Sequence, residues 1–127
     1  MLLDTDIIIW SLRGNDSATD YIDSLDEIFI SGITYMELIQ GTKSKKECRD
    51  LIKTLDAIEV QSIPISENIS SQAITLVKTF AHSHSMQLAD SLIASTAIIH
   101  NLPFTSGNKK HFEQIPELKF YVFRKKE

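Results

Sequence analysis

The 127-residue sequence predicts a single-domain α/β fold, with a mainly parallel sheet and helices on both of its faces. Short apolar runs alternate with longer segments of helical periodicity along the whole chain. Hydrophobic residues make up 43% of the chain and charged residues 24%, a balance that is typical of a globular protein and excludes a disordered or fibrous one. The length suits one compact core and no repeat or linker divides it, so residues 1–127 are expected to form one domain.

The expected strands are short segments rich in apolar and β-branched residues. They are residues 1–3, 27–31, 58–65, 103–106 and 120–123. Helical segments separate the first four of them, and parallel neighbours need crossover connections of this kind. The helices of such crossovers pack onto the sheet, which is why both faces are expected to be covered.

The expected helices are recognised by capping residues as well as by periodicity. Asp6 is expected to cap a helix over Ile7–Leu12, and Ser17 is expected to cap the next one. A turn at Gly32 should lead into a third helix that stops at Gly41. The longer helices are expected over residues 44–57, from 66 through at least 80, and over 87–101.

Charge, cysteine content and the N-terminal residues narrow the function classes. The formal net charge is −4, so bulk charge gives no sign of a general nucleic-acid binder, although bound cations can offset acidic charge locally. The single cysteine, Cys48, excludes an intramolecular disulfide. The start Met-Leu-Leu-Asp lacks the basic region of a signal peptide, and the longest apolar run, Ile7–Trp10, is far shorter than a membrane span. We therefore expect a cytoplasmic protein without a membrane partner.

Acidic residues lie where the carboxyl ends of the predicted strands should meet. Asp4 and Asp6 follow the first strand. Glu37 lies in the helix after the second strand, and Asp90 lies near the start of a later helix. Because ligands bind at this edge of an open parallel sheet, we expect Asp4, Glu37 and Asp90 to face one pocket. Taken singly, each acid also fits a plainer role as a turn residue, a helix cap or an exposed helical side chain.

Three carboxylates in one pocket predict a metal site. Neighbouring carboxylates repel one another and share protons unless a cation lies between them. Carboxylate oxygens are hard ligands that suit Mg²⁺ or Mn²⁺. Such an ion activates water and stabilises the charge on a phosphoryl group, and hydrolysis of a phosphodiester needs both effects.

Four segments of the chain together resemble a known family. They are Leu2-Leu3-Asp4-Thr5-Asp6, Glu37-Leu38-Ile39-Gln40-Gly41, Ala89-Asp90-Ser91-Leu92-Ile93-Ala94-Ser95 and Ser106-Gly107-Asn108-Lys109-Lys110-His111-Phe112. In this order they resemble the signatures of the PIN-domain ribonucleases, and more narrowly those of the VapC-type toxins of bacterial toxin–antitoxin pairs. The resemblance spans essentially the whole chain.

The resemblance implies a PIN-like (Rossmann-like) sheet and a metal-dependent endoribonuclease that cleaves RNA by water attack on a phosphodiester. Carried over by position, Asp4, Glu37 and Asp90 become the catalytic acids that bind Mg²⁺ or Mn²⁺. Ser106 stands where the family often has Thr and would order Asp4 or a water, and Asn108 would hydrogen-bond within the site. Transfer RNA is the substrate that the family suggests. The resemblance also implies a homodimer and a small cognate antitoxin that covers the active-site groove.

Further residues near these motifs are candidates for supporting roles. Asp6 is one, and His111 is another, standing where many family members have a fourth acid. A histidine there either binds metal or phosphate, or is a partly exposed loop residue beside Phe112. A three-acid site is therefore expected, and the binding of a second ion stays open. A basic cluster after Glu37 suits phosphate steering or a solvated helix face. It consists of Lys43, Lys45, Lys46 and Arg49.

Two alternative functions fit parts of the sequence. In a haloacid-dehalogenase-like phosphatase, Asp4 would be the nucleophile and Asp6 the general acid. Phe104-Thr105-Ser106-Gly107 faintly resembles a phosphate-binding motif of that family, but a late pair of acids is missing and Ile8 departs from its pattern. The other alternative is a PIN-like binding module without activity. The three acids argue against such a module, and His111 argues for it.

Overall fold

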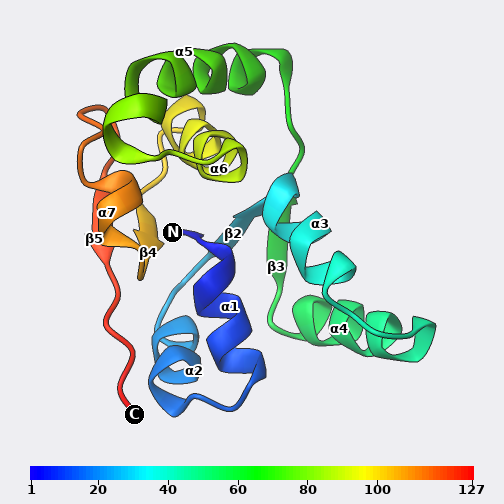
Figure 1. The fold of residues 1–127 in the computed structure, drawn as a ribbon. Helices are drawn as coiled ribbons and strands as arrows, with labels where there is room; N and C mark the ends of the chain where they lie inside the picture. Colours follow the sequence, from blue (N-terminus) through cyan, green and yellow to red (C-terminus); the bar gives the residue numbers. More distant parts are fainter.

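A five-stranded sheet with strand order β3-β2-β1-β4-β5 forms the centre of the computed structural model, which describes residues 1–127 (Figure 1). The strands are β1 Leu2–Leu3, β2 Ile28–Ser31, β3 Val60–Ile63, β4 Phe104–Ser106 and β5 Phe120–Val122. Leu2 pairs with Phe29 on one side and with Phe104 on the other, so β1 is the central strand. The predicted α/β fold is confirmed, and the sheet is parallel throughout.

Helices cover both faces of this sheet, as predicted. They are α1 Thr5–Leu12, α2 Asp16–Asp23, α3 Gly32–Gln40, α4 Lys45–Ala57, α5 Glu67–His84, α6 Leu88–Ile99 and α7 Lys109–Phe112. Successive strand residues point to opposite faces, so the buried Leu2 packs with residues of α5, α6 and α7, and the buried Leu3 packs with residues of α1 to α4. Figure 1 shows α5 beside α6, and α1 beside α2. None of these helices combines the length and the apolar character that crossing a membrane requires.

The caps of the first three helices differ from the prediction. Asp4, not Asp6, caps α1, because the helix starts directly after β1 and the Asp4 carboxylate accepts a hydrogen bond from the Thr5 amide. Asn15, not Ser17, caps α2, through a hydrogen bond from the Ala18 amide. Gly32 is the first residue of α3 and not a separate turn, since Ser31 caps that helix. Each helix therefore begins one or two residues earlier than its periodicity indicates.

The region around β4 and β5 holds one element that the sequence did not predict. Residues Lys109–Phe112 form α7, whereas a loop was expected around His111. A single helical turn is too short to show periodicity. Strand β3 is also shorter than the predicted 58–65, because Ile58 still caps the end of α4 and Glu59 has a positive φ of 58°.

The topology brings three strand ends to one edge of the sheet. Strand β1 runs into α1 at Asp4, β2 runs into α3 at Ser31, and β4 leads through Gly107 toward α7. Because all three strands are parallel, their carboxyl ends share this edge. Helix α6 packs against both α3 and α7, which places the first turn of α6, with Asp90, beside the same edge.

Candidate active site

Asp4 lies at the carboxyl end of the central strand and is 8% exposed. Its Oδ1 accepts a hydrogen bond from the Thr5 amide (2.8 Å), and its Oδ2 accepts one from the Ser106 hydroxyl (2.6 Å). Burial raises the pKa of Asp4 to about 7, and repulsion from Asp6 and Asp90 adds to the rise, although the two hydrogen bonds oppose it. Asp4 is thus held in one orientation at a place where its negative charge is poorly stabilised without a cation.

Asp6 lies beside Asp4 and anchors the turn that follows β4. Its Oδ2 accepts a hydrogen bond from the Gly107 amide (3.0 Å), while its Oδ1 is buried and has no hydrogen-bond partner. Burial raises the pKa of Asp6 as well. A Cβ at Gly107 would lie 2.5 Å from a ring carbon of Trp10, so only glycine lets the indole pack against this turn. The same Cβ would lie 3.0 Å from Asp6 Oδ2, so a residue other than glycine would also crowd the Asp6–Gly107 contact.

A chain of contacts links Asp4 to Asp90 through the segment after β4. The Ser106 hydroxyl, which donates to Asp4, accepts a hydrogen bond from the Asn108 amide (2.9 Å). The Asn108 side-chain nitrogen lies 2.9 Å from His111 Nδ1, and the same Nδ1 lies 2.8 Å from Asp90 Oδ2. His111 is therefore a partly buried residue of α7 in contact with a site acid. It also lies edge-on to Phe112, as one of the two sequence interpretations expected.

Asp90 occupies the first turn of α6. Its Oδ2 accepts a long hydrogen bond from the Gln87 amide (3.3 Å), so the residue also serves as part of a capping box for that helix. Both contacts of Asp90, to Gln87 and to His111, are made by Oδ2. The plain role as a helix-start acid and the role as a site acid are therefore compatible in this residue.

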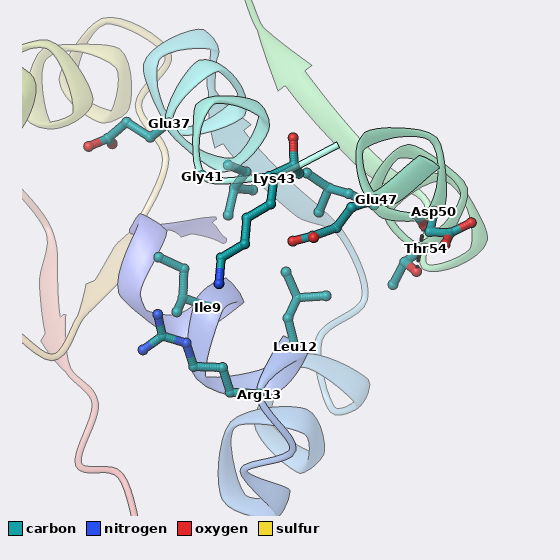
Figure 2. Close-up of a pocket in the computed structure, with 12 residues that line it drawn as sticks. Ile9, Leu12, Arg13, Glu37, Gly41, Lys43, Glu47, Asp50 and Thr54 are labelled. Atoms are coloured by element: carbon teal, nitrogen blue, oxygen red, sulfur yellow. Dashed lines mark hydrogen bonds between the residues drawn. The ribbon is translucent and has the colours of Figure 1, made fainter. Parts of the chain in front are cut away.

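Glu37 approaches the site from α3. Its Oε1 accepts a hydrogen bond from the Thr5 hydroxyl (2.8 Å), and that hydroxyl also lies 2.9 Å from the Thr34 hydroxyl. Figure 2 shows the Glu37 carboxylate turned away from Lys43 and from the groove that the figure outlines. Glu37 is exposed, and Thr5, which holds it, is the immediate neighbour of Asp4.

The three predicted acids thus border one edge of the sheet without forming a closed cluster. No three His, Cys, Asp or Glu side chains of the chain are grouped closely enough to hold a metal ion. Glu37 is turned onto Thr5 and Asp90 onto His111. The donor chemistry nevertheless fits a divalent cation, because carboxylate oxygens suit such an ion, and because burial, repulsion from Asp6 and a smaller repulsion from Asp90 raise the pKa of Asp4, which a bound cation would counteract.

A groove of about 500 Å³ lies between α1, α3 and α4, and of the three predicted acids only Glu37 lines it. Of the predicted basic cluster only Lys43 lines it, and Lys46 instead forms a 2.8 Å ion pair with Asp50. Arg13, at the end of α1, also lines the groove. No motif in the sequence marks Arg13. Its place at the end of the helix that follows Asp4 is the only signal that points to it.

Comparisons with known proteins agree with the fold and the motifs. The family model described as "PIN domain" matches residues 1–118. The chain is 32% identical over 123 residues to Ribonuclease VapC10 of Mycobacterium tuberculosis, covering 94% of this chain and 90% of that protein. It is also 32% identical over 124 residues to Ribonuclease VapC of Rickettsia bellii, covering 93% and 92%. The chain therefore belongs to the PIN-domain family, in its VapC-type group, as its motifs predicted.

Solved structures with the same fold point to the same group. A toxin–antitoxin complex from Klebsiella pneumoniae matches with a TM-score of 0.79 and 27% identity, over 97% of this chain and 95% of that chain. VapBC2 from Rickettsia felis, bound to a DNA fragment from its promoter, matches with a TM-score of 0.80 and 26% identity, over 97% and 98%. These relatives favour neither the phosphatase nor the inactive binding module among the alternatives.

Proposed function

We propose that this chain is a metal-dependent endoribonuclease, the toxin of a toxin–antitoxin pair. The observation that carries the proposal is the position of Asp4, buried at the carboxyl end of the central strand, with Asp6 and Asp90 close enough to raise its pKa. Acids held together in this way favour binding of a divalent cation. Relatives in the VapC-type group carry the name ribonuclease, which supports RNA as the substrate.

In this proposal Asp4, Glu37 and Asp90 hold Mg²⁺ or Mn²⁺. The ion, when bound, supplies Lewis acidity and an activated water for attack on a phosphodiester. Glu37 is exposed and is held by a single hydroxyl contact, so rotation of its side chain can bring it toward Asp4. Asp90 uses only Oδ2 in its contacts with its neighbours, which leaves Oδ1 for a ligand.

The surrounding residues position these acids. Ser106 and the Thr5 amide fix the two oxygens of Asp4, and His111 fixes the orientation of Asp90. Asn108 connects the two sides, because it contacts both Ser106 and His111. Mutation of residues that orient metal ligands in this way commonly lowers metal affinity or activity by roughly 10- to 100-fold.

The partners follow from the same proposal. Structures that align with 97% of this chain are toxin–antitoxin complexes, so we propose a small cognate antitoxin as the physiological partner. We further propose that residues 1–127 act as one nuclease domain, that the chain forms a homodimer, and that it acts in the cytoplasm on RNA, with transfer RNA as the first class to test.

The test is cleavage of a mixed small-RNA fraction by the purified chain without its antitoxin. Mn²⁺ or Mg²⁺ should support cleavage and a chelator should abolish it, because the proposed water activation needs the ion. Asp90→Asn should abolish it as well. Asp56→Asn is the matched control, since Asp56 is exposed at the end of α4. Cleavage that persists in chelator would contradict the proposal. So would equal cleavage by the Asp90→Asn and Asp56→Asn variants.

A further inference from the structure

Two cationic side chains enter the groove beside the candidate active site. The groove between α1, α3 and α4 is lined by Glu37, Lys43, Arg13 and Glu47, among other residues, over a volume of about 500 Å³. Figure 2 shows Lys43 reaching from the end of α3 toward α1, so that its amine and the Arg13 guanidinium point toward the same part of the groove, over Ile9. The groove thus brings a pair of cations next to Glu37, a proposed metal ligand whose carboxylate is turned onto Thr5.

Local hydrogen bonds fix the backbone positions from which the Lys43 and Arg13 side chains extend. Lys43 follows a turn in which the amide and the hydroxyl of Thr42 both donate to the carbonyl of Ile39, at 3.0 and 2.7 Å. Arg13 is the C-cap of α1, and its amide donates to the carbonyl of Ile9 (2.9 Å). The backbone therefore presents both side chains to the groove, and only their own rotatable bonds remain free.

Neither cation has an anionic partner within the chain. The ion pairs of the chain are Lys46–Asp50, Lys109–Glu113 and His111–Asp90. Arg13 and Lys43 make no side-chain hydrogen bond either, although Glu47 and Asp50 line the same groove. Asp50 is occupied by Lys46, at 2.8 Å. Two unpaired cations that face the same space repel each other, and an anion placed between them would be attracted to both.

We propose that Arg13 and Lys43 bind a backbone phosphate of the RNA that flanks the phosphodiester to be cleaved. The inference rests on the proposed nuclease function and adds positioning residues to it. A guanidinium pairs with two phosphate oxygens at once and an ammonium adds a point charge, so together they suit a phosphate. Because the chain is acidic overall, with a net charge of −4, such local cations are needed to hold a polyanion near three carboxylates.

Glu47 limits the path that an RNA strand can take through the groove. It lines the groove from α4 and has no ion-pair partner. The Glu47 carboxylate would repel any phosphate placed on the α4 side of the groove. The phosphate bound by Arg13 and Lys43 should therefore lie on the α1 side. Contacts to phosphate position a strand without reading its bases. Arg13 and Lys43 should therefore raise affinity for RNA and leave the position of the cut unchanged.

The experiment compares charge reversals inside and outside the groove. Binding of a fluorescein-labelled single-stranded RNA of mixed sequence is measured by anisotropy in chelator, so that the RNA stays intact, at several salt concentrations. Lys43→Glu is compared with Lys53→Glu, and Arg13→Glu with Arg49→Glu. Lys53 and Arg49 are exposed on α4 outside the groove, so each pair changes the net charge equally.

The groove variants should bind RNA about tenfold more weakly or worse, because each loses a charged phosphate contact. The dependence of log affinity on log salt should become shallower by roughly 0.7 for each lost phosphate contact, and the control variants should change little. In cleavage with Mn²⁺, Lys43→Glu should raise KM and leave kcat near that of the unsubstituted chain. The conservative variant Lys43→Arg should keep most of the affinity, since it keeps the positive charge.

Three results would overturn the inference, and they are distinguishable. Equal losses in Lys43→Glu and Lys53→Glu would show a general effect of charge and no phosphate site. Unchanged RNA affinity in both groove variants would also overturn the inference, and the groove would then be a candidate surface for a protein partner. A lack of both binding and cleavage of RNA by the unsubstituted chain would overturn the nuclease function on which the inference rests.

Discussion

Ser106 donates a 2.6 Å hydrogen bond to Asp4 across two neighbouring parallel strands. The register of β1 and β4, in which Leu3 pairs with Thr105, places the two residues side by side at the edge of the sheet. Both side chains are buried, so water cannot replace the bond. The sheet itself thus orients the acid on which the proposed metal site is built.

Replacement of Ser106 by alanine should therefore weaken both the fold and metal binding. Loss of the hydroxyl leaves a buried Asp4 oxygen without its donor, which should lower the free energy of unfolding by about 1–3 kcal/mol. The Mn²⁺ affinity, measured by calorimetry, should fall roughly 10- to 100-fold, as expected for a residue that orients a metal ligand. Ser106→Thr should keep both properties. Ser62→Ala, at an exposed serine of β3, is the control, and equal behaviour of the two alanine variants would contradict this role.

The stability of the metal-free chain should fall as the pH rises through the acidic range. Asp4 has an ordinary pKa of 3.8 and a pKa of about 7 in the folded chain, so between these values the folded state holds a proton that the unfolded state has released. The stability that this group contributes is thus complete below about pH 4 and is lost as the pH approaches 7, by roughly a few kcal/mol. Denaturant unfolding in chelator between pH 4 and 8 measures it.

Asp4→Asn supplies the control for that pH dependence. The variant cannot ionise at this position, so it should match the unsubstituted chain near pH 4 and be more stable than it at pH 8 in chelator. Saturating Mn²⁺ should reverse the ranking at pH 8, because the ion stabilises the ionised Asp4 of the unsubstituted chain. If the free energies of unfolding of the two proteins depended on pH in the same way in chelator, a raised pKa of Asp4 would be ruled out.

His111→Asp tests whether α7 belongs to the metal site. His111 contacts Asp90 at 2.8 Å, so an aspartate at this position adds a carboxylate next to a proposed ligand. We expect RNA cleavage to be preserved or raised, and calorimetry with Mn²⁺ to show one bound ion in the unsubstituted chain and a second in the variant. A substitution with no effect on metal binding or cleavage would place His111 among the ordinary residues of the helix surface.

Gly107→Ala should disturb the turn after β4. The added Cβ would lie 2.5 Å from the Trp10 ring, and either the indole or the turn must move. We expect a loss of about 1–3 kcal/mol in the free energy of unfolding and a change in the fluorescence of the chain's single tryptophan. Gly41→Ala is the control, because its Cβ would make only ordinary contacts, at 3.5 Å. Similar stability of both variants would contradict the close packing at Gly107.

Much of the fold could be predicted because local pattern and global topology agree. Alternating apolar segments and helical periodicity identified every strand and all helices except α7, which spans only four residues. Helix starts were less predictable, because Asp4 and Asp6 are both good caps and the choice depends on where β1 ends. The family of the chain followed from motifs that keep their order along the sequence.

The site could be predicted only in part, because side-chain contacts across the fold leave no local pattern. The sequence indicated that Asp4, Glu37 and Asp90 face one edge of the sheet. It did not indicate that Glu37 turns onto Thr5 or that Asp90 turns onto His111. Arg13 was missed for the same reason, since its place in the groove with Lys43 depends on how α1 packs against the end of α3, which is far away in the sequence.

The measurement that tests the central claim most directly is Mn²⁺-dependent cleavage of small RNA by Glu37→Gln. No three acids of the structure are grouped closely enough to hold an ion, and the Glu37 carboxylate contacts the Thr5 hydroxyl, so the three-acid site depends on its turning from Thr5 toward Asp4. We expect the variant to lose nearly all cleavage and to bind Mn²⁺ at least about tenfold more weakly, while Glu117→Gln, at an exposed glutamate, behaves like the unsubstituted chain. Full cleavage by a folded Glu37→Gln variant would contradict a metal site built from Asp4, Glu37 and Asp90.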